Sequence, residues 1–392
     1  MANGTNGDGP DTLYPSFMFD GFFNGSGGTT DCLDLLPPVP PPVKVFLLVV
    51  FSSVTVICGV GNSLLCFIVL TQKRLRSVTN LFIANLAFSD LLMAVLSVPF
   101  TLHYYLHQDW VFGSWMCSFV GTVKFVSIYV SINTLFVIAV DRYHGIFRPL
   151  RPRMEKGRLL LIVLAIWCVS FLVALPTPLF LTTSPPTTDC RGRTVRLCYE
   201  GWSNPRAAKG YMIFITVGEF LFPIYSMGFI YISIAVKLWT HRTPPGQVTA
   251  RHREIMLVRK QKTIPMLITV VVAFFVCYAP YHGYNLAMNY YQEEWHQTVP
   301  HFYTMYYVIE SVAMLNAVIS TFIYFVMSPM FRKETRNLAG RILCRCPPVF
   351  LGIRRVSFHS AASHSYNTTR NGSALRKPIG LVGPDNTLET KI

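Results

Sequence analysis

The sequence is poor in charged residues, and acidic residues are the scarcer kind. Lysine and arginine number 34 against 19 aspartates and glutamates, so the formal net charge is +15. Only 14% of the 392 residues are charged, whereas 52% are hydrophobic. Soluble domains carry about a quarter charged residues, so this composition excludes an ordinary water-soluble domain. It indicates a chain that lies mostly in lipid.

Several features of other protein classes are missing too. Residues 1–42 lack the cationic start and short apolar stretch of a secretion signal, so we expect the first apolar segment to direct membrane insertion. No internal repeat is evident, which disfavours a transporter built from duplicated halves. The apolar segments contain no set of histidine, aspartate and glutamate spaced as the ligands of a metal ion are, which disfavours an intramembrane hydrolase. The segment Pro300–Met327 contains no lysine, which a retinal Schiff base would require.

Seven apolar segments are long enough to cross a bilayer, whose core of about 30 Å requires about 20 apolar residues in a helix. They are Val43–Leu70, Val78–Leu106, Ser114–Tyr143, Leu159–Leu181, Gly210–Trp239, Thr263–Tyr291 and Pro300–Met327. The sequence therefore predicts an all-α membrane protein, a bundle of seven transmembrane helices followed by a short amphipathic eighth helix.

The basic residues predict the orientation of this bundle, because lysine and arginine gather in loops on the cytoplasmic side. None precedes Lys44, and 27 of the 34 fall in segments that are cytoplasmic if the N-terminus is outside. We therefore predict a plasma-membrane protein with an extracellular N-terminus. The basic cytoplasmic segments account for the positive net charge, so the charge does not indicate nucleic-acid binding. Asn3 and Asn24 begin acceptor sequences for N-glycosylation on the outer tail.

The chain is expected to have four parts. They are an extracellular tail (1–42), the transmembrane domain (43–327), an amphipathic helix on the inner membrane surface (328–346) and a disordered cytoplasmic tail (347–392). Cys344 and Cys346 follow a basic stretch just beyond the last span. Cysteines in that place are candidates for palmitoylation, with two free thiols as the alternative.

Polar residues recur inside the apolar segments, where they are rare and therefore candidates for function. The clearest are Asn62, Asp90, Asn133 and Asn316. Further motifs stand in the expected helices and order: Asp141–Tyr143, Trp167, Pro223 and Cys277–Pro280. From about Val43 to Arg341 the chain resembles the rhodopsin-like (class A) G-protein-coupled receptors.

Longer segments are similar to one group within that superfamily, the prokineticin receptors. They are Val126–Asn133, Asp141–Met154, Gly218–Phe220, Ala279–Gly283 and Ile309–Met314. This resemblance implies a receptor for an extracellular peptide or small secreted protein. It also implies a heterotrimeric G protein of the Gq class with calcium signalling, and arrestin and membrane lipid as further partners.

Three positions depart from the superfamily's general pattern. Ser320–Tyr324 stands where an Asn-Pro-x-x-Tyr motif is usual, and the prokineticin receptors depart there as well. Tyr278 replaces the tryptophan that usually lies beneath the pocket. Lys260 replaces an acid that in many relatives faces Arg142. These departures concern the energetics of the inactive state rather than the fold.

Three charged residues, Lys124, Glu219 and Glu310, lie in the outer halves of their predicted helices, where an unpaired charge is unfavourable. We expect them to line a ligand cavity together with Tyr281, His282 and His103. Neutralisation of Lys124 by Glu219 or Glu310 is the alternative. Basic residues on the second outer loop favour an acidic or large polypeptide ligand; they are Arg191, Arg193, Arg196, Arg206 and Lys209. Lys124 could also pair with an acidic lipid or another small anionic molecule, so a receptor for such a ligand remains the alternative function.

The inner half of the bundle carries two further predicted sites. The resemblance implies that Asp141, Arg142, Tyr143 and Tyr324 serve G-protein coupling. Arg142 would exchange an intramolecular carboxylate for contacts made when helices part, and snorkelling to lipid phosphates is the alternative. The second site is a cluster of oxygen-bearing side chains, Asn62, Asp90, Asn316 and Ser320. Such a cluster suits a sodium ion, which would be the cofactor of this protein. A purely structural hydrogen-bond network is the alternative.

Four of the ten cysteines fall on the predicted outer side, which permits two disulfides. The resemblance implies that Cys117, at the outer end of the third helix, is bonded to Cys198 in the second outer loop. Cys190 would then remain for Cys32, a pairing that sequence alone leaves open.

Overall fold

The computed structural model describes residues 38–148, 154–188, 192–240, 250–298 and 302–345, some by their backbone alone. The chain divides into two compact units, Met1–Leu343 and Cys344–Ile392, and the helical bundle belongs to the first. The predicted glycosylation sites Asn3 and Asn24, Cys32, Cys190 and Cys346 lie outside the described residues, as does the tail from residue 347.

The first two long helices are each made of consecutive segments. The first comprises α2 (Pro41–Ser53), a π-helical segment η1 (Val54–Cys58) and α3 (Gly59–Thr71). The second comprises α4 (Val78–Leu96) and α5 (Val98–His107). The first helix begins at Pro41, before the predicted Val43, because proline is well tolerated in the first helical turn. The Ser77 hydroxyl accepts a hydrogen bond from the Asn80 N–H and so caps α4.

The remaining helices follow in the predicted order. They are α6 (Gly113–Phe147), α7 (Lys156–Ala174), α8 (Pro176–Phe180), α9 (Pro205–Ile215), the π-helical η3 (Thr216–Leu221), α10 (Phe222–Thr240), α11 (Ala250–Thr298), α12 (Phe302–Met327) and α13 (Pro329–Arg345). Within the described ranges, seven helical spans are long and apolar enough to cross a membrane. The prediction of a seven-helix bundle is therefore confirmed.

Two helices are longer than the apolar segments that predicted them. The fifth span begins at Pro205 rather than Gly210, because Asn204 caps it and proline occupies its first turn. Helix α11 extends beyond the predicted Thr263–Tyr291 at both ends. The added turns are polar, so a search for apolar segments of membrane length does not detect them.

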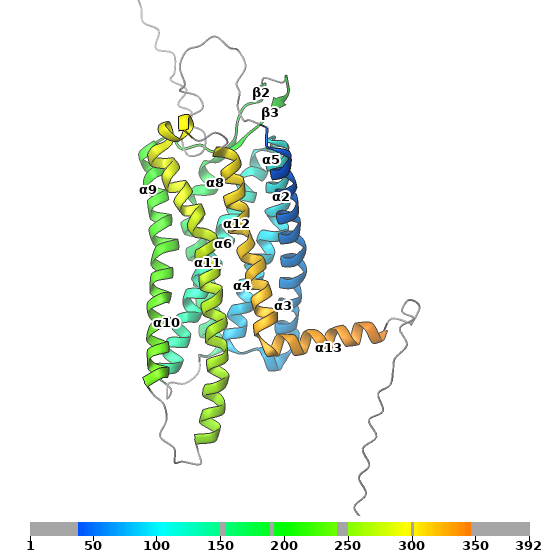
Figure 1. The fold of residues 1–392 in the computed structure, drawn as a ribbon, viewed down its shortest axis with the longest axis vertical. Helices are drawn as coiled ribbons and strands as arrows, with labels where there is room; N and C mark the ends of the chain where they lie inside the picture. Colours follow the sequence, from blue (N-terminus) through cyan, green and yellow to red (C-terminus); the bar gives the residue numbers. More distant parts are fainter. Residues whose placement is uncertain (1–37, 149–153, 189–191, 241–249, 299–301, 346–392) are drawn as a thin grey trace, which may run out of the picture. The chain divides into compact units, whose positions relative to one another are not determined.

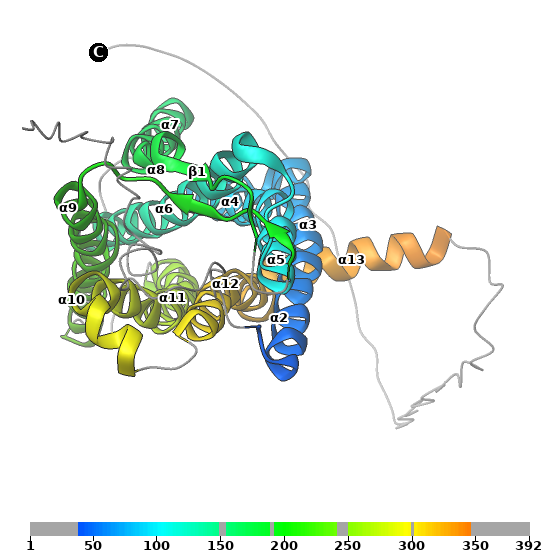
Figure 2. The same ribbon diagram turned by 90° about the horizontal axis from the view of Figure 1, so that it is seen from above.

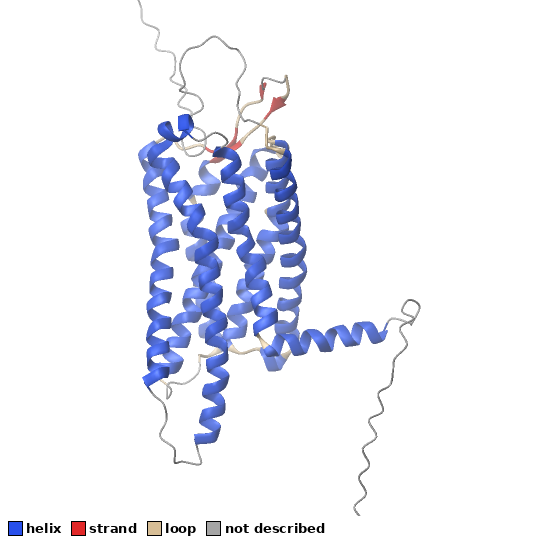
Figure 3. Ribbon diagram, viewed as in Figure 1, coloured by secondary structure: helices blue, strands red, loops and turns tan. Residues whose placement is uncertain are grey.

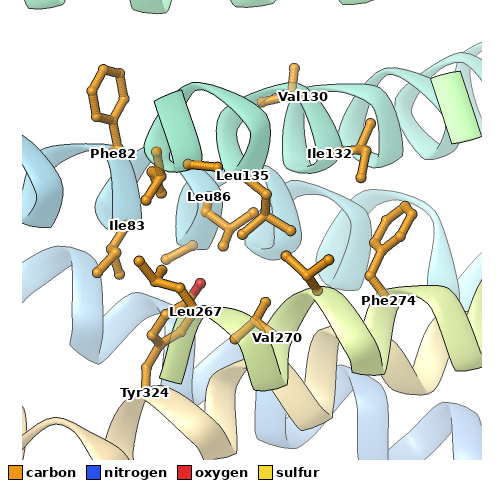
Figure 4. Close-up of a cluster of buried hydrophobic side chains, with 14 of the residues drawn as sticks. Phe82, Ile83, Leu86, Val130, Ile132, Leu135, Leu267, Val270, Phe274 and Tyr324 are labelled. Atoms are coloured by element: carbon orange, nitrogen blue, oxygen red, sulfur yellow. The ribbon is translucent and has the colours of Figure 1, made fainter. Parts of the chain in front are cut away.

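The long helices run side by side, alternately up and down (Figures 1 and 3). Seen from above, α6 passes through the interior, where it packs against α4, α7 and α10 (Figure 2). Apolar side chains from α4, α6, α11 and α12 meet in the core (Figure 4). Among them are Phe82, Leu86, Ile132, Leu135, Leu267, Val270, Phe274 and Tyr324. Phe331 of α13 is also buried in this core.

A small hairpin closes one end of the bundle. Strand β1 (Leu181–Thr183) pairs antiparallel with β4 (Cys198–Glu200), and β2 (Thr187–Thr188) pairs with β3 (Thr194–Val195). A disulfide joins Cys117 of α6 to Cys198, as the resemblance implied. The bundle thus has a disulfide end and, at the far end of α6, an Arg142 end. At Gly121 an added Cβ would lie 2.4 Å from Leu181 Cδ2, so this glycine lets β1 approach α6 closely.

Removing the disulfide tests how strongly the hairpin is anchored. Loss of a native disulfide typically costs about 2–5 kcal/mol, so we expect Cys117→Ser to lower the thermal unfolding midpoint of the purified protein clearly. Cys168→Ser is the matched control, because Cys168 is a free, exposed cysteine. Equal midpoints for Cys117→Ser and the wild type would contradict the expected anchoring role.

Candidate functional site

A buried ion pair crosses the interior near the disulfide end. The Lys124 ammonium of α6 lies 3.0 Å from Oε1 of Glu310 on α12, and the two side chains are 15% and 2% exposed. Tyr105 of α5 donates a hydrogen bond to the other oxygen of the Glu310 carboxylate. Three helices are therefore held together by one charged cluster. Of the two neutralising partners expected for Lys124, the structure selects Glu310.

Glu219 lies elsewhere. It belongs to η3, and its carboxylate accepts a hydrogen bond from the Asn133 amide at 3.1 Å. The same amide lies 3.3 Å from the Ser170 hydroxyl of α7. Glu219 is thus tied to α6 and α7 and does not line the cavity described next, although we expected it there.

A cavity at the disulfide end holds about 1190 Å³ of empty space, including solvent at its mouth. Lys124, Tyr281 and His282 line it, as expected. Glu310 lies behind Lys124 and is not a lining residue. His103 is also not a lining residue; its ring stacks on His107 at 4.4 Å between centroids. The expected set of six therefore separates into three lining residues and three that lie outside the wall.

Tyrosine makes up much of the cavity wall, and sequence reasoning missed it. The tyrosines not anticipated are Tyr104, Tyr105, Tyr129, Tyr199, Tyr211, Tyr306 and Tyr307. The Tyr105 and Tyr307 rings stack at 4.2 Å between centroids.

Helix periodicity could have predicted two further lining residues on α6, because residues three and four positions before Lys124 share its face. Gly121 and Val120 stand at those positions and do line the cavity.

The loop between α8 and α9 supplies the roof of this cavity through Tyr199 and Glu200 of β4. The Trp202 indole donates a hydrogen bond of 2.8 Å to the Glu200 carboxylate, and its ring stacks on Phe180 at 4.0 Å. Burial raises the pKa of Glu200 above its ordinary value, while this hydrogen bond and the charge of Lys124 act in the opposite direction. The sequence contained no motif that singled out Glu200.

Deeper in the bundle, Asp90 of α4 is buried and accepts a hydrogen bond of 3.1 Å from the Ser131 hydroxyl. Asn62 Oδ1 accepts one from Thr321 at 3.2 Å. Asn316 Oδ1 is buried without a hydrogen-bond partner among the described residues, and Ser320 is buried as well. A carboxylate with hydroxyl and amide oxygens is the kind of set that suits a hard cation such as sodium. The kinds of oxygen present suit a sodium ion, and binding of that ion stays a prediction.

At the Arg142 end, the Arg142 guanidinium pairs with Asp141 and donates a hydrogen bond to Thr79 at the start of α4. The hydroxyl of Tyr324 is buried without a hydrogen-bond partner among the described side chains. Both groups can gain partners if the helices separate at this end. The side chain of Lys260 lies outside the described residues, so its relation to Arg142 stays a prediction.

The remaining coupling candidate, Tyr143, stacks on Phe147 at 4.3 Å within α6. Along the same helix, 18 residues separate Lys124 from Arg142, which at 1.5 Å per residue is about 27 Å. The cavity and the Arg142 cluster are therefore two distinct sites joined by one continuous helix.

Comparison with known proteins agrees with this architecture. Residues 61–324 match the family described as 7 transmembrane receptor (rhodopsin family). The chain belongs to this family. It is therefore a class A G-protein-coupled receptor, a multi-pass membrane protein and not an enzyme.

The receptor is also similar to individual curated proteins. Prokineticin receptor 2 of Mus musculus is 33% identical to it over 286 residues, covering 71% of this chain and 73% of the relative. Prokineticin receptor 1 of Homo sapiens is 33% identical over 282 residues, covering 71% of each. Prokineticin receptor 1 of Rattus norvegicus is 31% identical over 304 residues, covering 76% and 75%. The likeness expected from the sequence is confirmed.

The ion pair can be tested by single and double substitution. Breaking a buried pair from one side costs about 3–5 kcal/mol, because a charge is left uncompensated. We expect Lys124→Met to lower the thermal midpoint of the purified receptor, and Lys124→Met with Glu310→Gln to recover most of the loss. Lys209→Met, the same change at an exposed lysine, should have little effect. A double variant less stable than Lys124→Met would contradict the pairing.

Proposed function

We propose that this receptor binds an extracellular polypeptide similar to a prokineticin and activates a heterotrimeric G protein. The main observation in support is the tyrosine-lined cavity at one end of α6, with the Arg142 cluster about 27 Å away at the other end. The names of the curated relatives supply the ligand class. Coupling to Gq with calcium signalling, and arrestin as a further partner, belong to the same proposal.

The mechanism is a shift between two populations of the bundle. A ligand that binds more tightly to the conformation with an open Arg142 end raises the population of that conformation. We assign to the closed conformation the arrangement in the structure, in which Arg142 is held by Asp141 and Thr79. Opening releases the guanidinium and the Tyr324 hydroxyl for contacts with the G protein. No covalent chemistry is required.

The alternative of a small anionic ligand loses its main support. It depended on a free positive charge at Lys124, which is instead bonded to Glu310. An anion would have to displace that carboxylate, whose second oxygen is also held by Tyr105. A polypeptide, which makes many contacts over a large wall, does not require that displacement.

Two further features complete the proposal. Asp90, with Asn62, Asn316 and Ser320, would hold a sodium ion in the closed conformation, where the ion would balance a buried carboxylate. Helix α13 would lie on the inner membrane surface, anchored by palmitate on Cys344 and Cys346. Both proposals follow from the kinds of residue present.

We further propose that the disulfide end faces outward, as the distribution of basic residues predicts. Glycosidase treatment should then lower the apparent mass of the wild type and leave Asn3→Gln/Asn24→Gln unchanged. Gel mobility of receptor from mammalian cells measures this. Asn367→Gln/Asn371→Gln is the matched control, because its two acceptor sequences lie on the proposed cytoplasmic tail. A glycan on Asn367 or Asn371 would reverse the orientation.

Coupling can be separated from binding at Arg142. We expect Arg142→Ala to preserve binding of labelled prokineticin while abolishing G-protein activation, because the two sites are about 27 Å apart. Linkage requires that the G protein raise agonist affinity by the factor that agonist raises G-protein affinity. Excess guanine nucleotide should therefore weaken agonist binding to the wild type and not to Arg142→Ala.

The control for this experiment is Arg158→Ala, which removes an exposed arginine at the start of α7. It should retain both activation and the effect of guanine nucleotide. Radioligand competition on membranes from the three forms provides the readout. Normal G-protein activation by Arg142→Ala would refute the mechanism.

A further inference from the structure

The charges in the cavity do not balance. Lys124 and Glu200 both line it, and Glu310 lies directly behind Lys124. The Lys124 ammonium is 3.0 Å from one oxygen of Glu310, and Tyr105 donates to the other. Lys124 is thus neutralised from behind. Glu200 forms no salt bridge among the described residues, and the charge of Lys124 acts on it only at longer range.

Glu200 is held in a fixed position on the roof. Its backbone is in β4, paired with Leu181 of β1, two residues after the disulfide at Cys198. Its carboxylate accepts a hydrogen bond from Trp202, which is itself buried. A carboxylate offers about four acceptor positions, so the bond from Trp202 leaves capacity for a ligand.

The surrounding wall favours the same sign of ligand charge. Aromatic ring faces attract cations, most strongly when water is excluded. Lys124 already makes such a contact, 4.9 Å from the centre of the Phe125 ring. Tyrosines contributed by α5, α6, α9, α11 and α12 supply further rings around the space below Glu200. An anion in this space would meet a carboxylate and the negative faces of these rings.

We propose that the cavity receives a cationic group of the ligand, an ammonium or guanidinium of a polypeptide, with Glu200 as its counter-ion. This inference rests on the proposed function, because it assigns the cavity to the ligand. It also gives the loop two roles. Exposed Arg196 on the loop, with exposed Arg206 in the first turn of α9, suits an acidic ligand body, whereas Glu200 on the inner part of the loop suits a basic tip.

Three fragments that share a phenyl ring and differ in charge test the proposal without the natural ligand. They are phenethylammonium, 2-phenylethanol and phenylacetate. Each is titrated into the purified full-length receptor, and the dissociation constant is taken from the rise in thermal midpoint. We expect phenethylammonium to bind at least about tenfold more tightly than phenylacetate, as one charge-assisted hydrogen bond would give.

Glu200→Gln is the decisive variant, because an amide oxygen can still accept the hydrogen bond from Trp202. We expect it to abolish the preference for phenethylammonium and to leave binding of 2-phenylethanol unchanged. Asp109→Asn is the matched control. It removes a negative charge at the same end, where Asp109 accepts a hydrogen bond from the Arg196 N–H outside the cavity wall. This control should keep the full preference.

The outcomes separate this inference from the proposed function. Equal or tighter binding of phenylacetate to the wild type, no measurable binding of phenethylammonium, or a preference that survives in Glu200→Gln would each overturn the assignment of Glu200. None of these results depends on which polypeptide activates the receptor. Failure of prokineticin to activate a receptor that shows the expected fragment preference would instead refute the ligand class and leave the cationic site intact.

Discussion

A polar group inside a bilayer has no water to bond with, so it must find its partner within the protein. The helices solve this for the backbone, and side chains solve it between helices. Trp167 donates to Asn85, which in turn donates to Thr134, so that α7, α4 and α6 share one chain of hydrogen bonds. In this receptor the buried polar residues therefore specify which helices are neighbours, while the apolar core supplies most of the packing.

The same constraint is met differently at the two ends of the bundle. Near the disulfide end, both oxygens of Glu310 are engaged by Lys124 and Tyr105, which ties three helices together beside the cavity. At the other end, Arg142 is held by a neighbouring carboxylate and a hydroxyl, and Tyr324 has an unused hydroxyl. One end tied together by a charged cluster and another end whose polar groups can change partners are what transmission of a signal through a bundle requires.

Much of the fold could be predicted from the sequence, because membrane thickness sets the length of an apolar helix. Depth could be predicted as well, and Lys124 and Arg142 do occupy opposite halves of α6. The rotation of each helix about its own axis could not. This rotation places Lys124 against Glu310 and Glu219 against Asn133. It also brings tyrosines from five helices to one cavity. Glu200 was missed because a loop residue has no periodic pattern.

The π-helical segments η1 and η3 impose a condition on chain length. A π turn contains an extra residue compared with an α turn, and each residue of a helix turns the chain by about 100°. Deleting one residue from Thr216–Leu221 would restore an ordinary α-helix and leave the side chains on both sides facing as before, because the wider turn absorbs the extra residue. A deletion in the α-helical part of the same span would instead rotate the remainder by about 100° and present different residues to α6. Correct numbering of helix positions in this receptor therefore requires a phase correction at Val54–Cys58 and another at Thr216–Leu221.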